Sequence, residues 1–291
     1  MSLDLFGGEP TLEWEYVVDV LSKIKQICDM NKVFLFTTIT SNGYLLDEHK
    51  VLDLLPFNFT YAQITLDGTK PFHDLKRITK DKQPTFDVII NNLHTLLRVS
   101  DDVQIGIRVN CDDENITSIP LFVEYIFNEL GNKRVSIMYC YAKYEVDNDE
   151  RSIPGEYNGM TESDFINELP SLYNESKKFG FFTPDYYHIN GLCVAKSKHS
   201  IILHPSGYVY KCPAHIGKKE YQVGNIFETK FFDNFFDEKK YKGCMLKKCI
   251  FIPLCHTGCI ISHNNTLEAP CKKNMLEKIN KMHISGNLRI I

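Results

Sequence analysis

Long hydrophobic runs are missing from this sequence of 291 residues, and none of its apolar stretches approaches the roughly 20 residues that span a bilayer. The N-terminus, Met1–Leu5, has no basic segment followed by a long apolar one, so it does not have the form of a signal peptide. The net charge is only −4, with both signs interspersed, and gives no indication of nucleic-acid or membrane binding. From these absences we expect a cytoplasmic protein that binds neither membranes nor nucleic acids.

Cysteine, in contrast, is abundant: the chain has ten. Three of them are scattered, and we expect Cys28, Cys111 and Cys140 to be packed, inert thiols. The other seven lie between Cys193 and Cys271. In a reducing compartment, clustered cysteines bind metal more often than they form disulfides. This shift in composition predicts two domains, residues 1–182 and 183–291.

The first of these domains alternates short apolar runs with helical patterns, which favours an α/β fold with a parallel sheet, either open or rolled into a barrel. The alternation stops near Phe182, and the remainder has too little apolar material for a large core. The predicted strands are Ser2–Phe6, Val33–Thr40, Tyr61–Leu66, Val103–Asn110 and Arg134–Tyr141, and then Ser200–His204 and Tyr208–Lys211 in the second domain. The predicted helix faces begin with Val17, Val20, Leu21, Ile24 and Ile27, and continue with Val88–Leu97, Phe122–Leu130 and Phe165–Phe179.

A Gly-Gly-Glu-Pro motif follows the first predicted strand and opens a helix. Gly7 and Gly8 allow a ligand to approach the backbone closely, and Pro10 suits a first helical turn. Glu9 supplies a carboxylate at the carboxyl edge of the sheet, where parallel-sheet proteins bind their ligands. By itself, a strand-to-helix turn with glycines is more often only a turn than a binding site.

The seven clustered cysteines have definite spacing. Four residues separate Cys244 from Cys249, five separate Cys249 from Cys255, and three separate Cys255 from Cys259. Four thiolates in a compact site are what an iron–sulfur cluster or a tetrahedral zinc ion requires, and seven nearly fill two such sites. Soft thiolate ligands suit both metals, so spacing alone leaves iron–sulfur and zinc open.

Taken together, these features resemble the radical S-adenosylmethionine (SAM) enzymes with a C-terminal twin iron–sulfur (SPASM) domain. The resemblance is carried by Gly-Gly-Glu-Pro, by Thr40–Gly43, by Ile64–Gly68 followed by His73 and Asp74, and by Ile107–Asn110. It implies a partial (β/α) barrel that lacks its first strand–helix unit, followed by a small cysteine-rich SPASM domain. The residues that the resemblance implies for SAM binding are Gly7, Gly8, Glu9, Pro10, Thr65, Arg108 and Asn110.

The same resemblance implies two auxiliary 4Fe–4S clusters. Their ligands would be Cys193, Cys212 and Cys259 for the first cluster, and Cys244, Cys249, Cys255 and Cys271 for the second. The four residues between Cys244 and Cys249 depart from the family, which usually has two there. The first cluster has only three cysteines, so its fourth iron would bind another group or the substrate.

One element of the family is missing. SAM cleavage uses a third 4Fe–4S cluster held by Cys-x-x-x-Cys-x-x-Cys, and Cys255 and Cys259 begin such a pattern but Ser262 stands where the third cysteine would be. We therefore expect a chain that is truncated at its N-terminus and inactive by itself. The missing unit would expose the edge of the first strand, which predicts a dimer or aggregate through that edge.

The resemblance implies a peptide- or protein-modifying maturase, in which a 5′-deoxyadenosyl radical abstracts hydrogen, with a thioether or other crosslink among the products. Its partners would be a peptide or protein substrate and an electron donor such as a flavodoxin or ferredoxin. A sulfatase-maturing enzyme is an alternative, although that group usually has an acidic residue directly after the cysteine that matches Cys212, and Pro213-Ala214-His215 follows here. A non-catalytic binding module stabilised by zinc is a further alternative.

Overall fold

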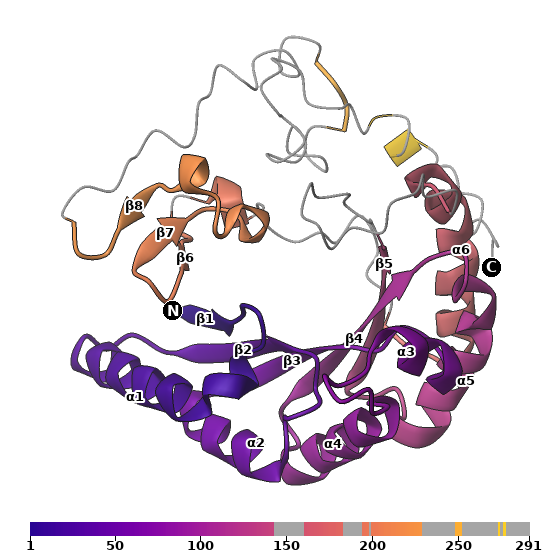
Figure 1. Cartoon of the computed structure of the whole chain (residues 1–291), viewed down its shortest axis with the longest axis horizontal. Helices are drawn as coiled ribbons and strands as arrows, with labels where there is room; N and C mark the ends of the chain where they lie inside the picture. The colour runs from indigo at the N-terminus through magenta and orange to yellow at the C-terminus, as the bar shows by residue number, and fades with distance from the viewer. Residues whose placement is uncertain are drawn as a thin grey trace, which may run out of the picture. The chain divides into compact units, whose positions relative to one another are not determined.

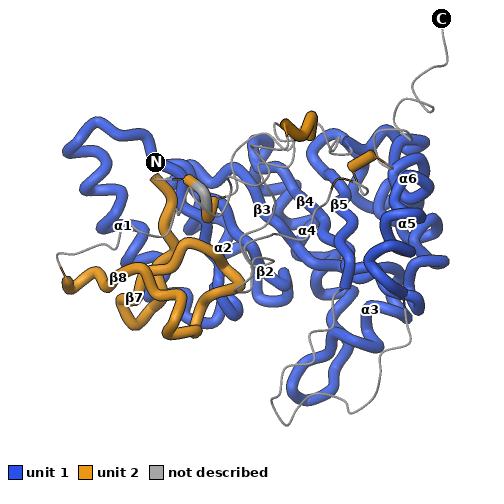
Figure 2. The backbone as a smooth tube through the Cα atoms, turned by 90° about the horizontal axis from the view of Figure 1, so that it is seen from above, with its two compact units in different colours: residues 1–183 blue, residues 184–291 orange. Residues whose placement is uncertain are grey.

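The computed structural model describes residues 1–142, 160–182, 194–197, 199–228, 248–251, 273 and 276–277. The chain divides into two compact units, Met1–Thr183 and Pro184–Ile291, shown in two colours in Figure 2. No helix in the described ranges is both long and apolar enough to cross a membrane.

The first unit contains a five-stranded sheet in which all neighbouring strands are parallel. The order in the sheet follows the chain, so each strand pairs with the next one along the sequence. All five predicted strands are confirmed, with ends that differ by a few residues. The strands are β1 (Ser2–Leu5), β2 (Phe36–Ser41), β3 (Phe59–Thr65), β4 (Gln104–Cys111) and β5 (Val135–Tyr141).

Helices connect the successive strands of this unit, and one more helix follows the last strand. All four predicted helices are present, and Figure 1 shows α1, α2, α4, α5 and α6 along the outer side of the curved sheet. The predicted face of the first helix is wrong at its end, because Ile27 is exposed and Cys28, one position later, is buried as a packing thiol. The helices are α1 (Trp14–Met30), α2 (Glu48–Leu54), α3 (Lys70–Lys76), α4 (Phe86–Val99), α5 (Ile119–Leu130) and α6 (Glu162–Lys178).

Two features of the helix ends have clear causes. Asp74 of α3 accepts hydrogen bonds at 2.9 Å from the backbone N–H groups of both Thr85 and Phe86, and so satisfies donors at the start of α4. Thr161 and Asp164 form a capping box at the start of α6, in which each side chain accepts from the backbone of the other residue. The carboxylate of Asp74 therefore joins the short helix α3 to the longer helix α4.

The two faces of the parallel sheet differ in polarity. The outer face is buried under the helices, whereas the inner face is polar and partly exposed. Parallel sheets normally have apolar residues on both faces because both are covered by helices. The polar, half-buried side chains of the inner face are therefore not those of a sheet face that helices cover. Buried outer residues are Ile39, Ala62, Ile64, Ile107 and Val109, and half-buried inner residues are Thr40, Gln63, Thr65, Arg108 and Asn110.

Gly106 packs closely against the neighbouring strand on the inner face. A Cβ atom there would lie 1.8 Å from the hydroxyl oxygen of Tyr61 on the neighbouring strand. We expect Gly106→Ala to lower the free energy of unfolding by about 1–3 kcal/mol, since the Tyr61 ring must be displaced. Urea unfolding measures this loss. In the background of Tyr61→Ala the same substitution should cost far less, and an equal cost in both backgrounds would contradict the steric explanation.

The second unit contains a three-stranded antiparallel sheet in its described part, made of β6 (Ile202–Leu203), β7 (Tyr208–Tyr210) and β8 (Gly224–Asn225). The two strands predicted here are confirmed but are shorter than expected. Gly207 has a φ of +87° in the turn before β7, a conformation that favours glycine. Val209 and Tyr210 are buried, so this small sheet has a core of its own.

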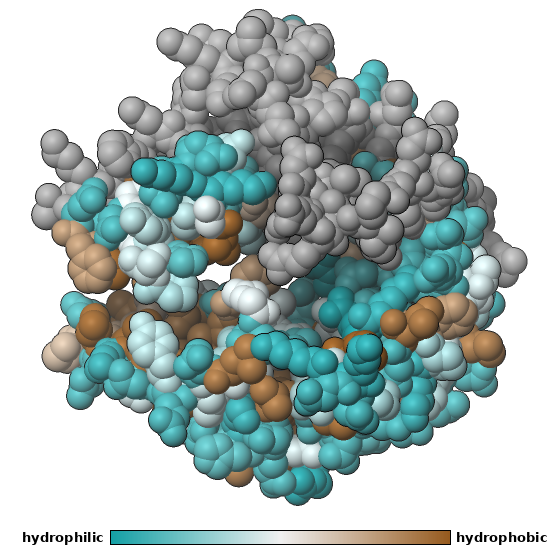
Figure 3. Space-filling model, viewed as in Figure 1, coloured by the Kyte–Doolittle hydropathy of each residue, from teal (hydrophilic) through white to brown (hydrophobic). Residues whose placement is uncertain are grey.

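On the face shown in Figure 3, hydrophobic and hydrophilic residues are interspersed over the coloured part of the molecule. The most exposed large side chains of α1 and of the segment after it are Met30 and Phe34, at 75% and 78%. Phe34 lies near the amino end of β2, beside the edge strand β1, since Met1 bonds the backbone of Phe34 and Phe36 there.

Candidate functional site

The Gly-Gly-Glu-Pro turn lies where β1 ends, and its glutamate joins two strand ends. Oε1 of Glu9 accepts from the backbone N–H and the hydroxyl of Thr11, at 3.1 and 2.7 Å, and from the hydroxyl of Ser41 at 2.8 Å. Oε2 accepts from the backbone N–H of Asn42 at 2.7 Å. Glu9 thereby caps the 3-10 helix Pro10–Glu13 and ties it to the end of β2.

The glycines of this turn have a different environment. Gly7 and Gly8 are exposed, and a Cβ atom at either would meet nothing within 4 Å. Gly7 has a φ of +143°, which only glycine adopts readily. Within the described residues no hydrogen bond engages the carbonyl groups of Gly7 and Gly8. The backbone of the turn, rather than the carboxylate of Glu9, is what the turn presents to solvent.

We expect Glu9→Gln to destabilise the protein by about 1–3 kcal/mol, because the amide that replaces one oxygen brings its N–H toward a backbone or hydroxyl donor. The measurement is urea unfolding followed by circular dichroism. Glu13→Gln is the matched control, since Glu13 is exposed on the same short helix. Equal stability of the two variants would show that the hydrogen bonds of Glu9 contribute nothing.

The other three predicted SAM residues lie together at the carboxyl ends of β3 and β4. Thr65 and Arg108 are partners in the register of these strands. The Nε–H of Arg108 donates to Oδ1 of Asn110 at 3.0 Å. Nε of Arg108 is therefore already paired within the fold. Its two Nη atoms have no partner in the described part of the chain, so this end of the guanidinium is available to an anion.

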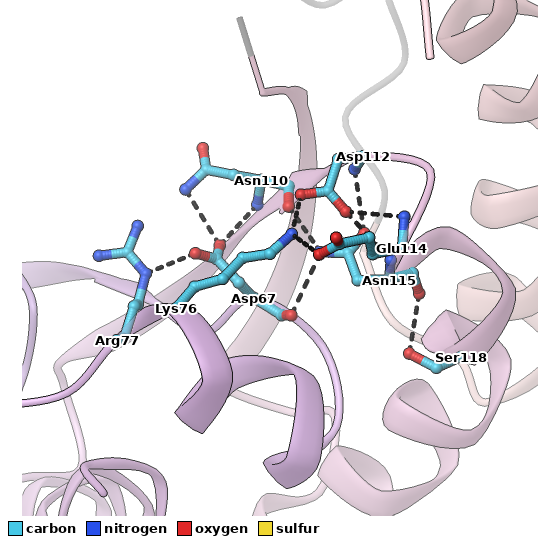
Figure 4. A network of polar contacts seen from close by, with 8 residues as sticks. All are labelled: Asp67, Lys76, Arg77, Asn110, Asp112, Glu114, Asn115 and Ser118. Carbon is cyan, nitrogen blue, oxygen red and sulfur yellow. Dashed lines mark hydrogen bonds and ion pairs between the residues drawn. The ribbon is translucent and has the colours of Figure 1, made fainter. Parts of the chain in front are cut away.

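Asp67 connects these residues to the loop that follows β3 (Figure 4). It is buried, and its Oδ1 accepts from the backbone N–H and the side-chain amide of Asn110, at 2.9 and 3.0 Å. Its Oδ2 accepts from Nε of Arg77. The amide of Asn115 donates to the carbonyl groups of Asp67 and Asn110, at 3.2 and 2.8 Å. These contacts fix the ends of β3 and β4 relative to each other.

A second set of charges lies next to this one in Figure 4. Lys76 forms ion pairs with Asp112 and with Glu114, the latter at 2.9 Å. Asp112 is buried and also accepts from the backbone N–H groups of Glu114 and Asn115, at 3.1 and 3.0 Å. Since both oxygens of Asp112 are used within the fold, this set orders the turn after β4 rather than offering a binding group.

Sequence reasoning assigned no role to Arg77 or to Asn115. The fork of Arg77 is half exposed, and its Nη atoms have no partner in the described ranges. For Leu66-Asp67-Gly68 and for His73-Asp74 the sequence indicates a family resemblance and no particular role. For Asp67 the available signal was its position directly after a buried strand, because side chains there meet at the carboxyl edge of a parallel sheet.

The scattered cysteines at the ends of β4 and β5 are unreactive in character. Cys111 is fully buried, and burial raises the pKa of its thiol far above the usual range. Cys140 is half-buried, and burial raises its pKa as well. A thiol with a raised pKa forms little of the reactive thiolate. The prediction that these two cysteines are packed thiols is consistent with this environment.

The proposed cluster ligands lie mostly outside the described residues: this is so for Cys193, Cys244, Cys255, Cys259 and Cys271. Cys212 is buried, directly before the 3-10 helix Pro213–His215, and Cys249 is half-buried. Within the described ranges no group of three or more potential metal ligands occurs. The assignment of these seven cysteines to two clusters therefore stays a prediction.

The sequence of this chain is similar to those of known proteins. Residues 3–114 match the model of the radical SAM superfamily. A cysteine-type anaerobic sulfatase-maturating enzyme from Clostridium novyi (strain NT) is 25% identical over 279 residues, which cover 87% of this chain and 71% of that protein.

Two solved structures share the fold. Native anSMEcpe with bound AdoMet and Kp18Cys peptide is 20% identical, with a TM-score of 0.72, and the match covers 98% of this chain and 83% of that one. Streptococcus suis SuiB bound to S-adenosylmethionine is 16% identical, with a TM-score of 0.56 and coverages of 92% and 63%. Over residues 3–114 this chain is thus similar to the radical SAM superfamily, and it shares its fold with these two structures.

Proposed function

We propose that this chain binds SAM on the inner face of a partial (β/α) barrel and belongs to a radical SAM maturase that modifies a peptide or protein. The observation that carries the proposal is the polar inner face of the sheet, where Thr65, Arg108 and Asn110 adjoin at the carboxyl ends of β3 and β4. When bound next to a reduced 4Fe–4S cluster, SAM supplies the oxidising power that removes a hydrogen atom from the substrate.

The residues present fit the amino-acid end of SAM. Carbonyl groups of Gly7 and Gly8 suit an ammonium group, because they are exposed acceptors without partners in the described part. The Nη atoms of Arg108 and of Arg77 suit a carboxylate, which a guanidinium fork binds in bidentate fashion. Thr65 and Asn110 offer neutral groups to the ribose hydroxyls. Glu9 contributes through the shape of the turn.

Titration with SAM tests this assignment. We expect weak binding by the isolated chain, and a further loss of about tenfold in affinity for Arg108→Ala. Isothermal calorimetry measures the affinity, and the fluorescence of Trp14, the only tryptophan, offers a second readout beside the turn. Arg98→Ala is the control, because Arg98 pairs with Glu48 at the surface. Absence of binding, or equal affinity of the two variants, contradicts the proposal.

The proposal includes two auxiliary clusters in the cysteine-rich unit, with Cys193, Cys212 and Cys259 on one and the other four cysteines on the second. Iron, sulfide and zinc are measured per chain after anaerobic purification and reconstitution. We expect about eight iron and about eight sulfide. One or two zinc with iron near zero would instead favour a zinc-stabilised binding module.

Sulfatase maturation is the second candidate, and the Clostridium novyi relative favours it. Pro213, which directly follows Cys212, does not provide the acidic group expected there. Fluorescence anisotropy with a labelled cysteine peptide of sulfatase origin separates the two. If the chain binds this peptide more tightly than a peptide of scrambled sequence, sulfatase maturation is favoured. If it binds both equally, another peptide substrate is favoured.

The proposal also includes a flavodoxin or ferredoxin as the electron donor, and a cytoplasmic location, where thiols stay reduced.

We also expect a dimer of this chain through β1. In the described residues β1 pairs with β2 alone, so one edge of β1 presents unpaired backbone groups. Exposed Phe34 and Phe36 beside it add apolar surface that association would cover. Sedimentation velocity over a range of concentrations measures the association. A monomer at every concentration would show that this edge does not pair.

A further inference from the structure

His73 of α3 is fully buried, and both nitrogen atoms of its ring have partners. Nδ1 lies 3.1 Å from the backbone nitrogen of Asp67, and Nε2 lies 3.0 Å from the hydroxyl oxygen of Thr85. A backbone N–H can only donate, so Nδ1 accepts and the ring proton is on Nε2. Thr85 then accepts from Nε2 and donates its own hydroxyl proton to the carbonyl of Arg77, at 2.7 Å. The network assigns one neutral tautomer.

Both ends of this hydrogen-bonded chain lead to Arg77. At one end, Thr85 binds the backbone carbonyl of Arg77. At the other end, His73 binds the N–H of Asp67, whose carboxylate accepts from Nε of Arg77. The backbone and the side chain of Arg77 are therefore both oriented through one imidazole ring.

The orientation of Asp67 matters beyond Arg77. Gly68, the next residue, has a φ of +97°, so the chain turns sharply after Asp67. The other oxygen of the Asp67 carboxylate holds Asn110 at the end of β4, and Asn110 in turn accepts from Arg108. A rotation of the Asp67 peptide would thus displace groups on two strand ends at once.

We propose that His73 is a positioning residue, which orients Asp67 and thereby aims the guanidinium of Arg77 and the amide of Asn110 at the SAM site. This inference rests on the proposed function. The ring acts through Asp67 and Thr85 and has no contact with the ligand. The proposal also explains the spacing between Asp67 and His73. This spacing lets the imidazole ring of His73, on the short helix α3, contact the backbone directly after β3.

A buried histidine can also be retained for stability alone, and two substitutions separate these roles. Asparagine places an acceptor oxygen near the position of Nδ1, so His73→Asn keeps the contact with Asp67 and loses Thr85. Glutamine places an amide N–H near the position of Nε2, so His73→Gln keeps Thr85 and loses Asp67. Each variant removes one hydrogen bond from the same buried site, so their losses of stability should be similar.

SAM affinity is the measurement that distinguishes them. We expect His73→Asn to bind SAM within about threefold of the unsubstituted chain and His73→Gln to bind about tenfold more weakly. Ile126→Val is the control for stability, because Ile126 is buried in α5 away from the site. It should lower stability and leave affinity unchanged. Equal losses of affinity in the two histidine variants, or no loss in either, overturn the positioning role.

A second readout needs no SAM. In spectra of the 15N-labelled chain, the Nε–H of Arg77 should exchange slowly with solvent, because Asp67 holds it. We expect this signal to persist in His73→Asn and to be lost in His73→Gln. If the unsubstituted chain binds no SAM but this pattern holds, the proposed function fails and the positioning of Arg77 stands. A signal that is the same in all three chains overturns the inference.

Discussion

Asp67→Asn should lower the free energy of unfolding by about 2–4 kcal/mol and abolish measurable SAM binding, because it removes the charge that the ends of β3 and β4 share. The oxygen of the new side-chain amide can still accept from Asn110. Its N–H groups then face Nε of Arg77, so that two donors oppose each other where a carboxylate oxygen now accepts. Chemical denaturation and calorimetric titration measure the two effects.

The origin of this effect is tested by a double-mutant cycle with Arg77→Met. If the ion pair is the cause, the two substitutions together should cost less than the sum of their separate costs, since the second removes the group that the first leaves uncompensated. Asp101→Asn is the matched control, because Asp101 is exposed in the loop before β4. Additive costs, or a cost no greater than that of the control, would show that the pair contributes nothing.

The strands and longer helices of the first unit are predictable because their apolar residues recur with a clear period. Ile105, Ile107 and Val109 alternate along β4, and Ile119, Phe122, Val123 and Ile126 follow the helical period in α5. The helices α2 and α3 have seven residues each and were not predicted. Such short helices bury too few side chains to produce a period, and their position is determined by contacts with other elements.

The site was predictable in part for a similar reason. Thr65, Arg108 and Asn110 could be placed together because strand ends meet at one edge of a parallel sheet. The contacts of Arg77 and Asn115 with Asp67 cross ten and 48 positions of sequence, respectively. Nothing local to either residue signals these contacts. The carboxylate of Glu9 likewise accepts hydrogen bonds from Ser41 and Asn42, which are more than 30 residues away in the sequence.

Stability should fall steeply in mild acid because of His73. Burial, and to a smaller degree the charge of Arg77, lowers the pKa of His73 from 6.5 to about 4, while Asp67 and Asp74 partly oppose this shift. The unfolded chain therefore takes up the proton first as the pH falls. The stability that neutral His73 contributes is complete above about pH 6.5, and is lost progressively as the pH falls from there to about 4.

A shift of this size corresponds to about 3 kcal/mol, since each unit of pKa is worth about 1.4 kcal/mol. Urea unfolding of the full chain at a series of pH values between about 7 and about 4.5 measures the slope. The same series with His73→Asn subtracts the pH dependence that does not come from His73. We expect the slope of this variant to be clearly shallower. Equal slopes of the unfolding free energy against pH in the two chains would show that His73 takes up its proton as readily in the folded as in the unfolded state. The network through Asp67 and Thr85 would then not hold His73 neutral.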